Sequence, residues 1–481
     1  MSWSQSGWGA NSWGQTGWGS GSGGSWDSIG SSAAYGVSWN EGNSSPVLTR
    51  LGSTAGFAAS ASPGNNNLPV HRLMRRCVMR DDGGIVYYLD QNNSLVKQGG
   101  GASVLDGTDG QVMVEIPLFW YKYSYSGTTH SWWISLNKFS GAERHPAFYK
   151  DGSWVANRYI GAYEGSMYDA SESVMCADAS ITTSIYAAGD KLCSVSGYRP
   201  KVYEIRAEFR AMAASRGASW RQQDFYLMSA LQLLCLVEYA NFNSQSMIGN
   251  GLTGYATSPN EPQANAGNSN SIGNAAGGSF QAVPKWAAST AKTVGAEVIP
   301  LAVQTGYTCI CTVAGTTGGA EPAWPTTLTD TIVDGGITWE CTRTLQYMSY
   351  RGIENFYGHL YKYIDGINVN GDIPYVCNTA SQFADDTTTN YVQLTDTGGS
   401  GITLGNAEGY IVTLEQTKGG FLPASVWGSP STYVTDYYVP NSGWCLPVIG
   451  GSVYNGVASG PFFIGLVSTQ ACSVFNGRLA Y

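Results

Sequence analysis

Short apolar runs separated by turn residues make up most of the chain and predict β-strands. The runs 77–79 and 85–89 are separated by an Asp-Gly-Gly sequence that is typical of a hairpin turn. This pattern extends over residues 33–110 and predicts a small β-rich N-terminal domain. The next apolar run, 112–123, contains Pro117, which has no backbone N–H, so we expect an edge strand or a bend there.

Helical periodicity is confined to two neighbouring segments. Residues 201–215 place apolar side chains three and four positions apart, which is the spacing of one helix face. Residues 224–240 are apolar on nearly every side, and Asp224 is a suitable N-cap. We expect this second helix to be central and covered on several sides.

A polar loop and a second β-rich segment follow the helices. Residues 241–280 consist almost entirely of Asn, Gly, Ser, Ala and Gln, and so long an irregular segment favours a binding surface. Residues 281–345 alternate apolar and polar positions, and we interpret them as a small inserted β-module, with carbohydrate binding as one option. Each aromatic residue of this insert is either a core side chain or a stacking platform for a sugar ring. The candidates are Trp286, Tyr307, Trp324 and Trp339.

The chain begins with a decapeptide repeat in which Trp recurs every five positions. The Gly- and Ser-rich composition of residues 1–32 is that of a flexible linker, whereas repeated tryptophans favour an arm that becomes ordered when a partner buries them. Both interpretations stay open, and the second predicts attachment to a larger assembly. The tryptophans concerned are Trp3, Trp8, Trp13 and Trp18.

Composition narrows the classes of partner. Only 12% of the residues are charged and 43% are hydrophobic, with 62 Gly, 16 Trp, 30 Tyr and 14 Phe. The formal charge of −9 disfavours binding to nucleic acid or to an anionic membrane, because the chain has no excess of cations to neutralise phosphates. The most hydrophobic stretch, 225–237, is shorter than the roughly twenty residues of a membrane span, so we expect no membrane insertion.

Residue types that usually carry catalysis or metal binding are sparse. The ten cysteines form no Cys-x-x-Cys pair, and the four histidines show no metal-ligand spacing. The N-terminus lacks the basic and apolar parts of a signal peptide, so we expect synthesis in a cytoplasm with reduced cysteines. We expect no metal, no cofactor and no catalytic residue.

Several motifs between residue 111 and the C-terminus resemble those of one family. They are His145-Pro146-Ala147-Phe148, Tyr159-Ile160-Gly161, Trp220-Arg221, Leu236 to Asn241, Arg351 to Asn355, Tyr363 to Gly366, Gly450 to Gly456, Gly460 to Phe463 and Gly477-Arg478-Leu479. With these motifs the sequence resembles C-type-lectin-fold proteins of bacteriophage tails, relatives of the phage tropism determinants. The resemblance implies an α+β C-type-lectin-like domain with two helices and mostly antiparallel strands, in a first part over 111–280 and a second part over 346–481.

The same resemblance implies a tail-fibre or tail-tip adhesin that binds a host cell-surface glycan or protein through its C-terminal hairpins. The protein would be made in the host cytoplasm and located in the virion tail, its N-terminal arm would contact other tail proteins, and a homotrimer is implied. The candidate ligand contacts are Trp444, Tyr454, Asn455, Phe462, Phe463, Thr469, Gln470, Ser473 and Phe475. For each of them ordinary hairpin packing is the alternative. For the whole protein the alternative is a structural virion component, such as a fibre-anchoring or decoration protein.

The sequence departs from the calcium-dependent and catalytic proteins of this fold. Calcium-dependent lectins use Glu-Pro-Asn or Gln-Pro-Asp with Trp-Asn-Asp, whereas Glu261-Pro262-Gln263 has no Trp-Asn-Asp after it, so no calcium-sugar site is expected. The similar formylglycine-generating oxidases need a reactive cysteine pair near the C-terminus. Cys445 and Cys472 have no basic or His neighbour in the sequence that would stabilise a thiolate, so we expect no enzyme activity.

Overall fold

Strands dominate the computed structural model of the chain. It describes residues 33–176, 183–253, 265–280, 284–301, 307–325, 327, 329–343 and 346–481. The N-terminal arm, with Trp3, Trp8, Trp13 and Trp18, lies outside the described residues. Of the described residues, about 37% lie in strands and 11% in helices.

This architecture is not the two-helix α+β C-type-lectin-like fold that the sequence motifs led us to expect. The described chain has three α-helices, two of them shorter than ten residues, and a β-rich body with a sheet curved like half a barrel. The prediction was wrong because it treated two helical segments as a helical layer of the fold. Strand pairing is non-local, and the motifs did not reveal how many short strands from distant segments would join the sheets.

The N-terminal residues contribute strands to sheets that they share with later residues. One antiparallel sheet has the order β2-β1-β7-β6-β8. Its strands are β1 (Tyr35–Asn40), β2 (Thr49–Gly52), β6 (Trp120–Ser126), β7 (Thr129–Ser135) and β8 (Glu143–Arg144). The alternation of β1 places Tyr35, Val37 and Trp39 in the core.

A six-stranded sheet joins the beginning and the end of the chain. Its order is β15-β35-β11-β5-β3-β4. The strands are β3 (Arg75–Met79), β4 (Ile85–Tyr88), β5 (Gln111–Pro117), β11 (Asn157–Gly161), β15 (Arg221–Gln222) and β35 (Leu479–Ala480). Because β3 pairs with β5, the expected domain boundary at residue 110 falls between two hydrogen-bonded strands. The run 112–123 is divided between β5 and β6, and β5 ends at Pro117.

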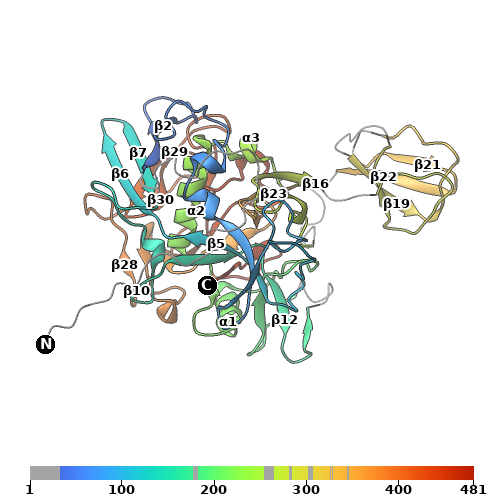
Figure 1. Cartoon of the computed structure of the whole chain (residues 1–481), viewed down its shortest axis with the longest axis horizontal. Coiled ribbons are helices and arrows are strands. Elements are labelled where there is room, and N and C mark those ends of the chain that lie inside the picture. Colours follow the sequence, from blue (N-terminus) through green and yellow to red (C-terminus); the bar gives the residue numbers. More distant parts are fainter. Residues whose placement is uncertain are drawn as a thin grey trace.

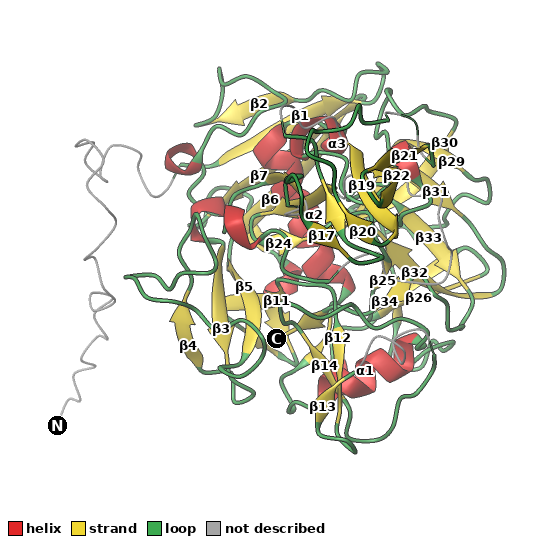
Figure 2. Cartoon of the chain, turned by 90° about the vertical axis from the view of Figure 1, so that its right-hand side faces the viewer, coloured by secondary structure: helices red, strands yellow, loops and turns green. Residues whose placement is uncertain are grey.

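Three helices lie between the strands: α1 (Arg206–Ala214), α2 (Phe225–Tyr239) and α3 (Ser244–Ile248). The predicted helix over 224–240 is confirmed by α2, which Asp224 caps by accepting a hydrogen bond from the Leu227 N–H at 2.9 Å. Every residue of α2 except Tyr226 is buried, and Figure 2 shows strands around this helix. None of the helices within the described ranges is long and apolar enough to cross a membrane.

The largest sheet gathers strands from the C-terminal part. Its main path is β28-β27-β26-β32-β33-β31-β29-β30, and β25 joins β32 to β34 beside it. The strands are β25 (Tyr361–Tyr363), β26 (Ile367–Asn370), β27 (Ile373–Val376), β28 (Val392–Gln393), β29 (Gly409–Thr417), β30 (Gly420–Val426), β31 (Tyr437–Val439), β32 (Trp444–Ile449), β33 (Ile464–Val467) and β34 (Phe475–Asn476). Strand β30 packs against α2, so this sheet covers one side of the central helix.

Smaller elements complete the main body. Two short strands, β9 (Tyr149–Lys150) and β10 (Ser153–Trp154), form a hairpin. Three others, β12 (Ser166–Asp169), β13 (Val174–Met175) and β14 (Lys191–Cys193), form a sheet in the order β13-β12-β14. The 3-10 helices are η1 (Asn65–Asn67), η2 (His71–Leu73), η3 (Pro146–Phe148), η5 (Asn270–Ile272), η6 (Ala380–Gln382) and η7 (Gly456–Ala458).

The segment interpreted as an insert extends away from the main body (Figure 1). Strands β16 (Gly277–Phe280) and β23 (Gln346–Tyr350) pair with each other at its base, and β23 also pairs with β24 (Ile353–Glu354). The insert contains β17 (Ala291–Lys292), β18 (Glu297–Val298), β19 (Tyr307–Val313), β20 (Gly315–Thr316), β21 (Thr331–Asp334) and β22 (Ile337–Arg343). Its sheet has the order β18-β19-β22-β21 and its buried residues form a separate core cluster around Trp339.

Candidate functional site

The three phenylalanines among the expected C-terminal contacts belong to the core. The ring of Phe462 lies 5.3 Å from that of Phe242, and Phe463 and Phe475 both pack on Tyr361. Each of the three is at most 4% exposed. We therefore correct them from candidate contacts to core residues. Phe462 and Phe463 are adjacent and both buried, so alternation did not separate inward from outward positions, and the sequence did not show that this whole segment packs in the core.

The remaining expected contacts divide between exposed and structural positions. Tyr454 is 45% exposed, whereas Ser473 is buried and Trp444 is half-buried in β32. The Oδ1 atom of Asn455 accepts hydrogen bonds from the backbone N–H and the hydroxyl of Ser452, at 2.8 and 3.0 Å. These two bonds hold the turn, so Tyr454 is the side chain of this group that is best placed to contact a partner.

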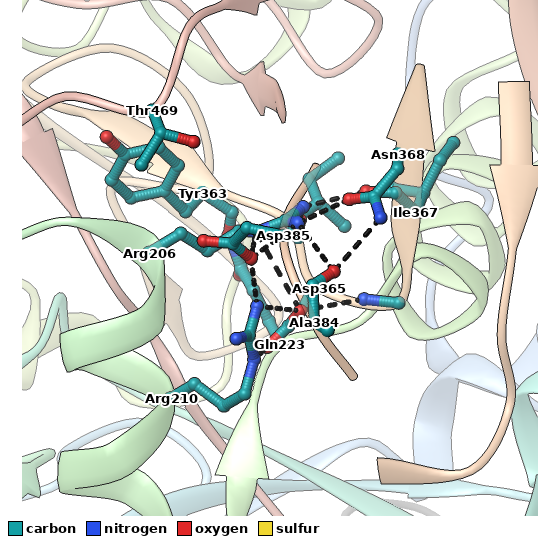
Figure 3. Close-up of polar contacts among 12 residues, drawn as sticks. Arg206, Arg210, Gln223, Tyr363, Asp365, Ile367, Asn368, Ala384, Asp385 and Thr469 are labelled. Carbon is teal, nitrogen blue, oxygen red and sulfur yellow. Dashed lines mark hydrogen bonds and ion pairs between the residues drawn. The ribbon is translucent and has the colours of Figure 1, made fainter. Parts of the chain in front are cut away.

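Thr469 and Gln470 are exposed, and Figure 3 shows Thr469 near Tyr363 and Asp385. The Thr469 hydroxyl donates to Asp386 at 2.9 Å, and the Gln470 carbonyl accepts a hydrogen bond from the Tyr363 hydroxyl at 2.6 Å. The first bond connects the C-terminal segment to the loop that follows Phe383, and the second connects it to β25.

Two arginines of α1 hold that loop in place. Arg210 forms two hydrogen bonds with Asp365, at 2.6 and 2.9 Å, and both Arg206 and Arg210 contact Asp385 (Figure 3). Burial by itself would raise the pKa of Asp385, but the two guanidinium groups lower it. The two arginines and the two aspartates of this cluster pair with one another. The cluster therefore stabilises the loop, and its net charge is too small to attract a charged ligand.

The tryptophans of the insert are mainly structural. Trp286 and Trp339 are 4% and 0% exposed, and both indole N–H groups donate to Oδ2 of Asp334, at 2.7 and 3.1 Å. Trp324 is half-buried, with its ring 6.0 Å from that of Trp339. The side chain of Tyr307 lies outside the described part of the structure. Of the two interpretations, the core role holds for Trp286 and Trp339.

The surface of the main body has a cleft of about 520 Å³ that aromatic residues from distant segments line. Trp120 begins β6, Tyr226 lies in the first turn of α2, and Tyr149 and Trp154 are partners across the β9–β10 hairpin. Trp154 is 45% exposed and Tyr149 is 39% exposed, and their rings lie 5.2 Å apart. Exposed aromatic faces gathered in a concave site indicate a ligand-binding surface.

Strand pairing places a guanidinium group between the two tryptophans of the cleft. Arg144 in β8 is the register partner of Trp120 in β6. Its guanidinium carbon lies 5.4 Å from the centre of the Trp120 ring and 5.3 Å from that of Trp154. The ammonium group of Lys138 lies 5.5 Å from the Trp120 ring. Cations at these distances are attracted to the electron-rich ring faces, which orders their long side chains.

A close contact between two turns supports one side of the cleft. His145 precedes η3 and caps it, because its Nδ1 accepts a hydrogen bond from the Ala147 N–H at 3.2 Å. Burial lowers the pKa of His145 to about 3, so the ring is neutral. The β29–β30 turn approaches Pro146 at Gly419, where a Cβ atom would lie 2.3 Å from the proline ring. The absence of a side chain at Gly419 thus allows this turn to present Lys418 to the cleft.

Several polar groups of the cleft are available to form hydrogen bonds with a ligand. Among the residues that the structure describes, the indole N–H groups of Trp120 and Trp154 donate no hydrogen bond, and the amide of Asn378 has no partner. Burial raises the pKa of Tyr226 to about 12, which keeps its hydroxyl protonated. A sugar ring offers apolar C–H faces for stacking and hydroxyl groups at its edge, so its chemistry matches this combination.

None of the cleft aromatics is among the site residues predicted from the sequence. Trp154 stands two residues after an Asp151-Gly152 turn, and an aromatic residue beside a tight turn is often exposed, so one usable signal was present. Arg144 and Tyr226 carried no such signal. Their position depends on the pairing of β6 with β8 and on the packing of α2.

Within the described ranges, no three His, Cys, Asp or Glu residues lie close enough together to hold a metal ion. All ten cysteines are free thiols, and burial raises the pKa of Cys445, which disfavours its thiolate form.

Comparison of the sequence with protein-family models gives no match, and comparison with curated proteins gives none either. A functional interpretation of the chain therefore depends on its own motifs and on the geometry of the cleft.

Proposed function

We propose that this chain is an adhesin that binds a cell-surface glycan in the cleft between Trp120 and Trp154. The observation that carries the proposal is the convergence, in one concave site, of exposed aromatic rings and polar groups that lack partners in the described chain. The volume of about 520 Å³ falls within the range of small-ligand sites, roughly 300–1,000 Å³.

The cleft offers two stacking surfaces of different character. Trp120 is half-buried in a strand that pairs on both sides, so its ring is held by the sheet. Trp154 and Tyr149 lie on a hairpin of two-residue strands and contribute the more exposed faces. A sugar unit that stacks on either surface leaves its hydroxyl groups near Arg144 and the indole N–H groups.

We propose a phage tail as the setting and a homotrimer as the assembly. The phage setting and the homotrimer both rest on the sequence resemblance. The Trp-rich arm, residues 1–32, would serve for attachment, and it is separate in the sequence from the residues of the cleft. Single sugar sites bind weakly, so several copies on one particle would raise the overall affinity through multivalency. The C-terminal surface around Tyr454 is the second candidate contact because that side chain is 45% exposed.

The test compares two matched substitutions, Trp154→Ala and Tyr454→Ala, in the full chain. Both side chains are 45% exposed, so neither change should disturb the core. Binding is measured to immobilised extracted surface glycans and to whole bacterial cells. We expect Trp154→Ala to weaken glycan binding about tenfold, which corresponds to roughly 1.4 kcal/mol of lost stacking, and Tyr454→Ala to leave it unchanged.

Two other outcomes would contradict the proposed site or the proposed function. A loss of binding with Tyr454→Ala alone would move the site to the C-terminal surface. If no glycan and no cell binds any of the three proteins, the adhesin proposal fails and the structural virion role becomes the better account.

A further inference from the structure

We infer that the cleft selects acidic glycans, with the carboxylate of a uronic or sialic acid seated against Arg144 and Lys138. This inference rests on the proposed glycan binding and adds the class of sugar. It starts from the charges that line the cleft, which are Lys138, Arg144 and Lys418 against the single carboxylate of Glu143. The chain as a whole carries a formal charge of −9, so this local excess of cations is opposite in sign to the rest of the molecule.

The one carboxylate of the cleft is already engaged. Oε2 of Glu143 pairs with the Lys418 ammonium group at 2.9 Å, and Oε1 accepts a hydrogen bond from the Tyr121 hydroxyl at 3.0 Å. Within the described residues, Lys138 and Arg144 form no ion pair with a carboxylate. The pairing of Glu143 with Lys418 thus leaves two positive charges for a ligand.

The position of Arg144 suits a carboxylate better than a hydroxyl group. A guanidinium group presents a planar set of N–H donors that matches the two oxygens of a carboxylate. Contacts with both tryptophan rings hold this group at 5.4 and 5.3 Å from their centres. A sugar stacked on Trp120 or Trp154 would place a ring carboxylate next to the guanidinium, so stacking and ion pairing act on the same sugar unit.

The experiment uses the full chain and matched pairs of oligosaccharides. The acidic probes are hexagalacturonate and an α-2,8-linked sialic acid tetramer, each compared with its methyl ester, and the neutral probes are maltohexaose and chitohexaose. Binding is measured for the wild type, Arg144→Gln, Lys138→Gln and Trp154→Ala. Lys292→Gln in β17 of the insert, which extends away from the body, controls for the loss of one positive charge.

We expect at least one acidic probe to bind about tenfold more tightly than its methyl ester. Arg144→Gln and Lys138→Gln should reduce that difference, Trp154→Ala should weaken both forms, and Lys292→Gln should change neither. Raising the salt concentration should weaken binding of the acid but not of the ester, because exposed charges are screened.

Two results would overturn the inference, and they can be told apart. If neutral probes or esters bind as tightly as the acids, with a loss on Trp154→Ala, the acid preference is wrong and the glycan-binding proposal stands. If none of the acidic, esterified or neutral probes binds, the glycan-binding proposal fails together with this inference.

Discussion

Buried arginine side chains hold many loops of this chain in place. Arg478 is 1% exposed, and its guanidinium group donates to the backbone carbonyls of Gly161, Ala162, Glu354 and Asn355. Gly161 and Glu354 are the last residues of β11 and β24, and a guanidinium group with five donors satisfies several carbonyls at once where strands end. Although only 12% of the chain is charged, several of these charges are therefore internal.

Asp436 gives a prediction about pH. It is 2% exposed, its Oδ2 accepts a hydrogen bond from the Phe462 N–H at 2.7 Å, and burial raises its pKa well above the ordinary value. A carboxyl group with a raised pKa in the folded state contributes stability below its unfolded pKa of about 4, and that contribution is lost as the pH rises toward the folded pKa. Asp436→Asn removes this titration and keeps an oxygen acceptor.

We therefore expect Asp436→Asn to gain stability relative to the wild type as the pH rises from 4 to 7. The slope should approach about 1.4 kcal/mol per pH unit while only the unfolded state is ionised. Urea unfolding of both proteins at several pH values provides the measurement. A free-energy difference that stays constant with pH would show that Asp436 is not protonated in the fold.

Very short strands and tight turns build the cleft. Arg144 and Trp154 both lie in strands of two residues, β8 and β10, whose local hydrogen bonding is too limited to position a side chain by itself. Their geometry depends on contacts with neighbouring elements, and one of these is the approach of the β29–β30 turn to Pro146 at Gly419.

Gly419→Ala tests this contact against a matched glycine. Gly419 and Gly443 have φ angles of 78° and 75°, but a Cβ atom at Gly443 would meet nothing within 4 Å. Gly443→Ala should cost about 1–2 kcal/mol, the strain of a left-handed backbone with a side chain. Gly419→Ala should cost more and should also weaken glycan binding, because the turn must move away from Pro146. Urea unfolding and glycan binding provide the two measurements, and equal effects of the two substitutions would contradict the proposed support of the cleft.

At the level of the complete chain, the insert and the body have separate cores. The insert's core cluster consists of Trp286, Val298, Cys309, Cys311, Ile337 and Trp339. Strands β16 and β23 pair up to Phe280 and Gln346, so the chain enters and leaves the insert through one hairpin-like pair. An independent core and adjacent ends allow a segment to be removed with little effect on the rest.

We predict that residues 281–345 can be replaced by an Asn-Gly turn. Phe280 and Gln346 are register partners, and a two-residue Asn-Gly turn closes such an antiparallel pair. The shortened protein should unfold cooperatively at a temperature within a few degrees of the wild-type value, as measured by circular dichroism. Its affinity for glycan should match that of the full chain. Loss of glycan binding by a folded, shortened protein would place the binding site in the insert.

Local sequence was sufficient for elements whose stabilising contacts are local. The apolar run of α2 and the capping side chain of Asp224 lie within one short segment, and the observed helix Phe225–Tyr239 matches the expected one. The Asp-Gly-Gly turn between the runs 77–79 and 85–89 likewise predicted the hairpin of β3 and β4, because a tight turn depends on residues that are neighbours in the sequence.

Only the tertiary structure decided the fold class, the buried face of each hairpin and the cleft. The segment around Phe462 shows no alternation of buried and exposed residues, and packing on Phe242 is what makes this phenylalanine internal. Similarly, Arg144 meets Trp120 and Trp154 because β6 pairs with β8 and the β9–β10 hairpin folds beside them. These contacts join segments that are far apart in the sequence. Local periodicity cannot predict them, because strand pairing is stabilised by contacts with distant segments.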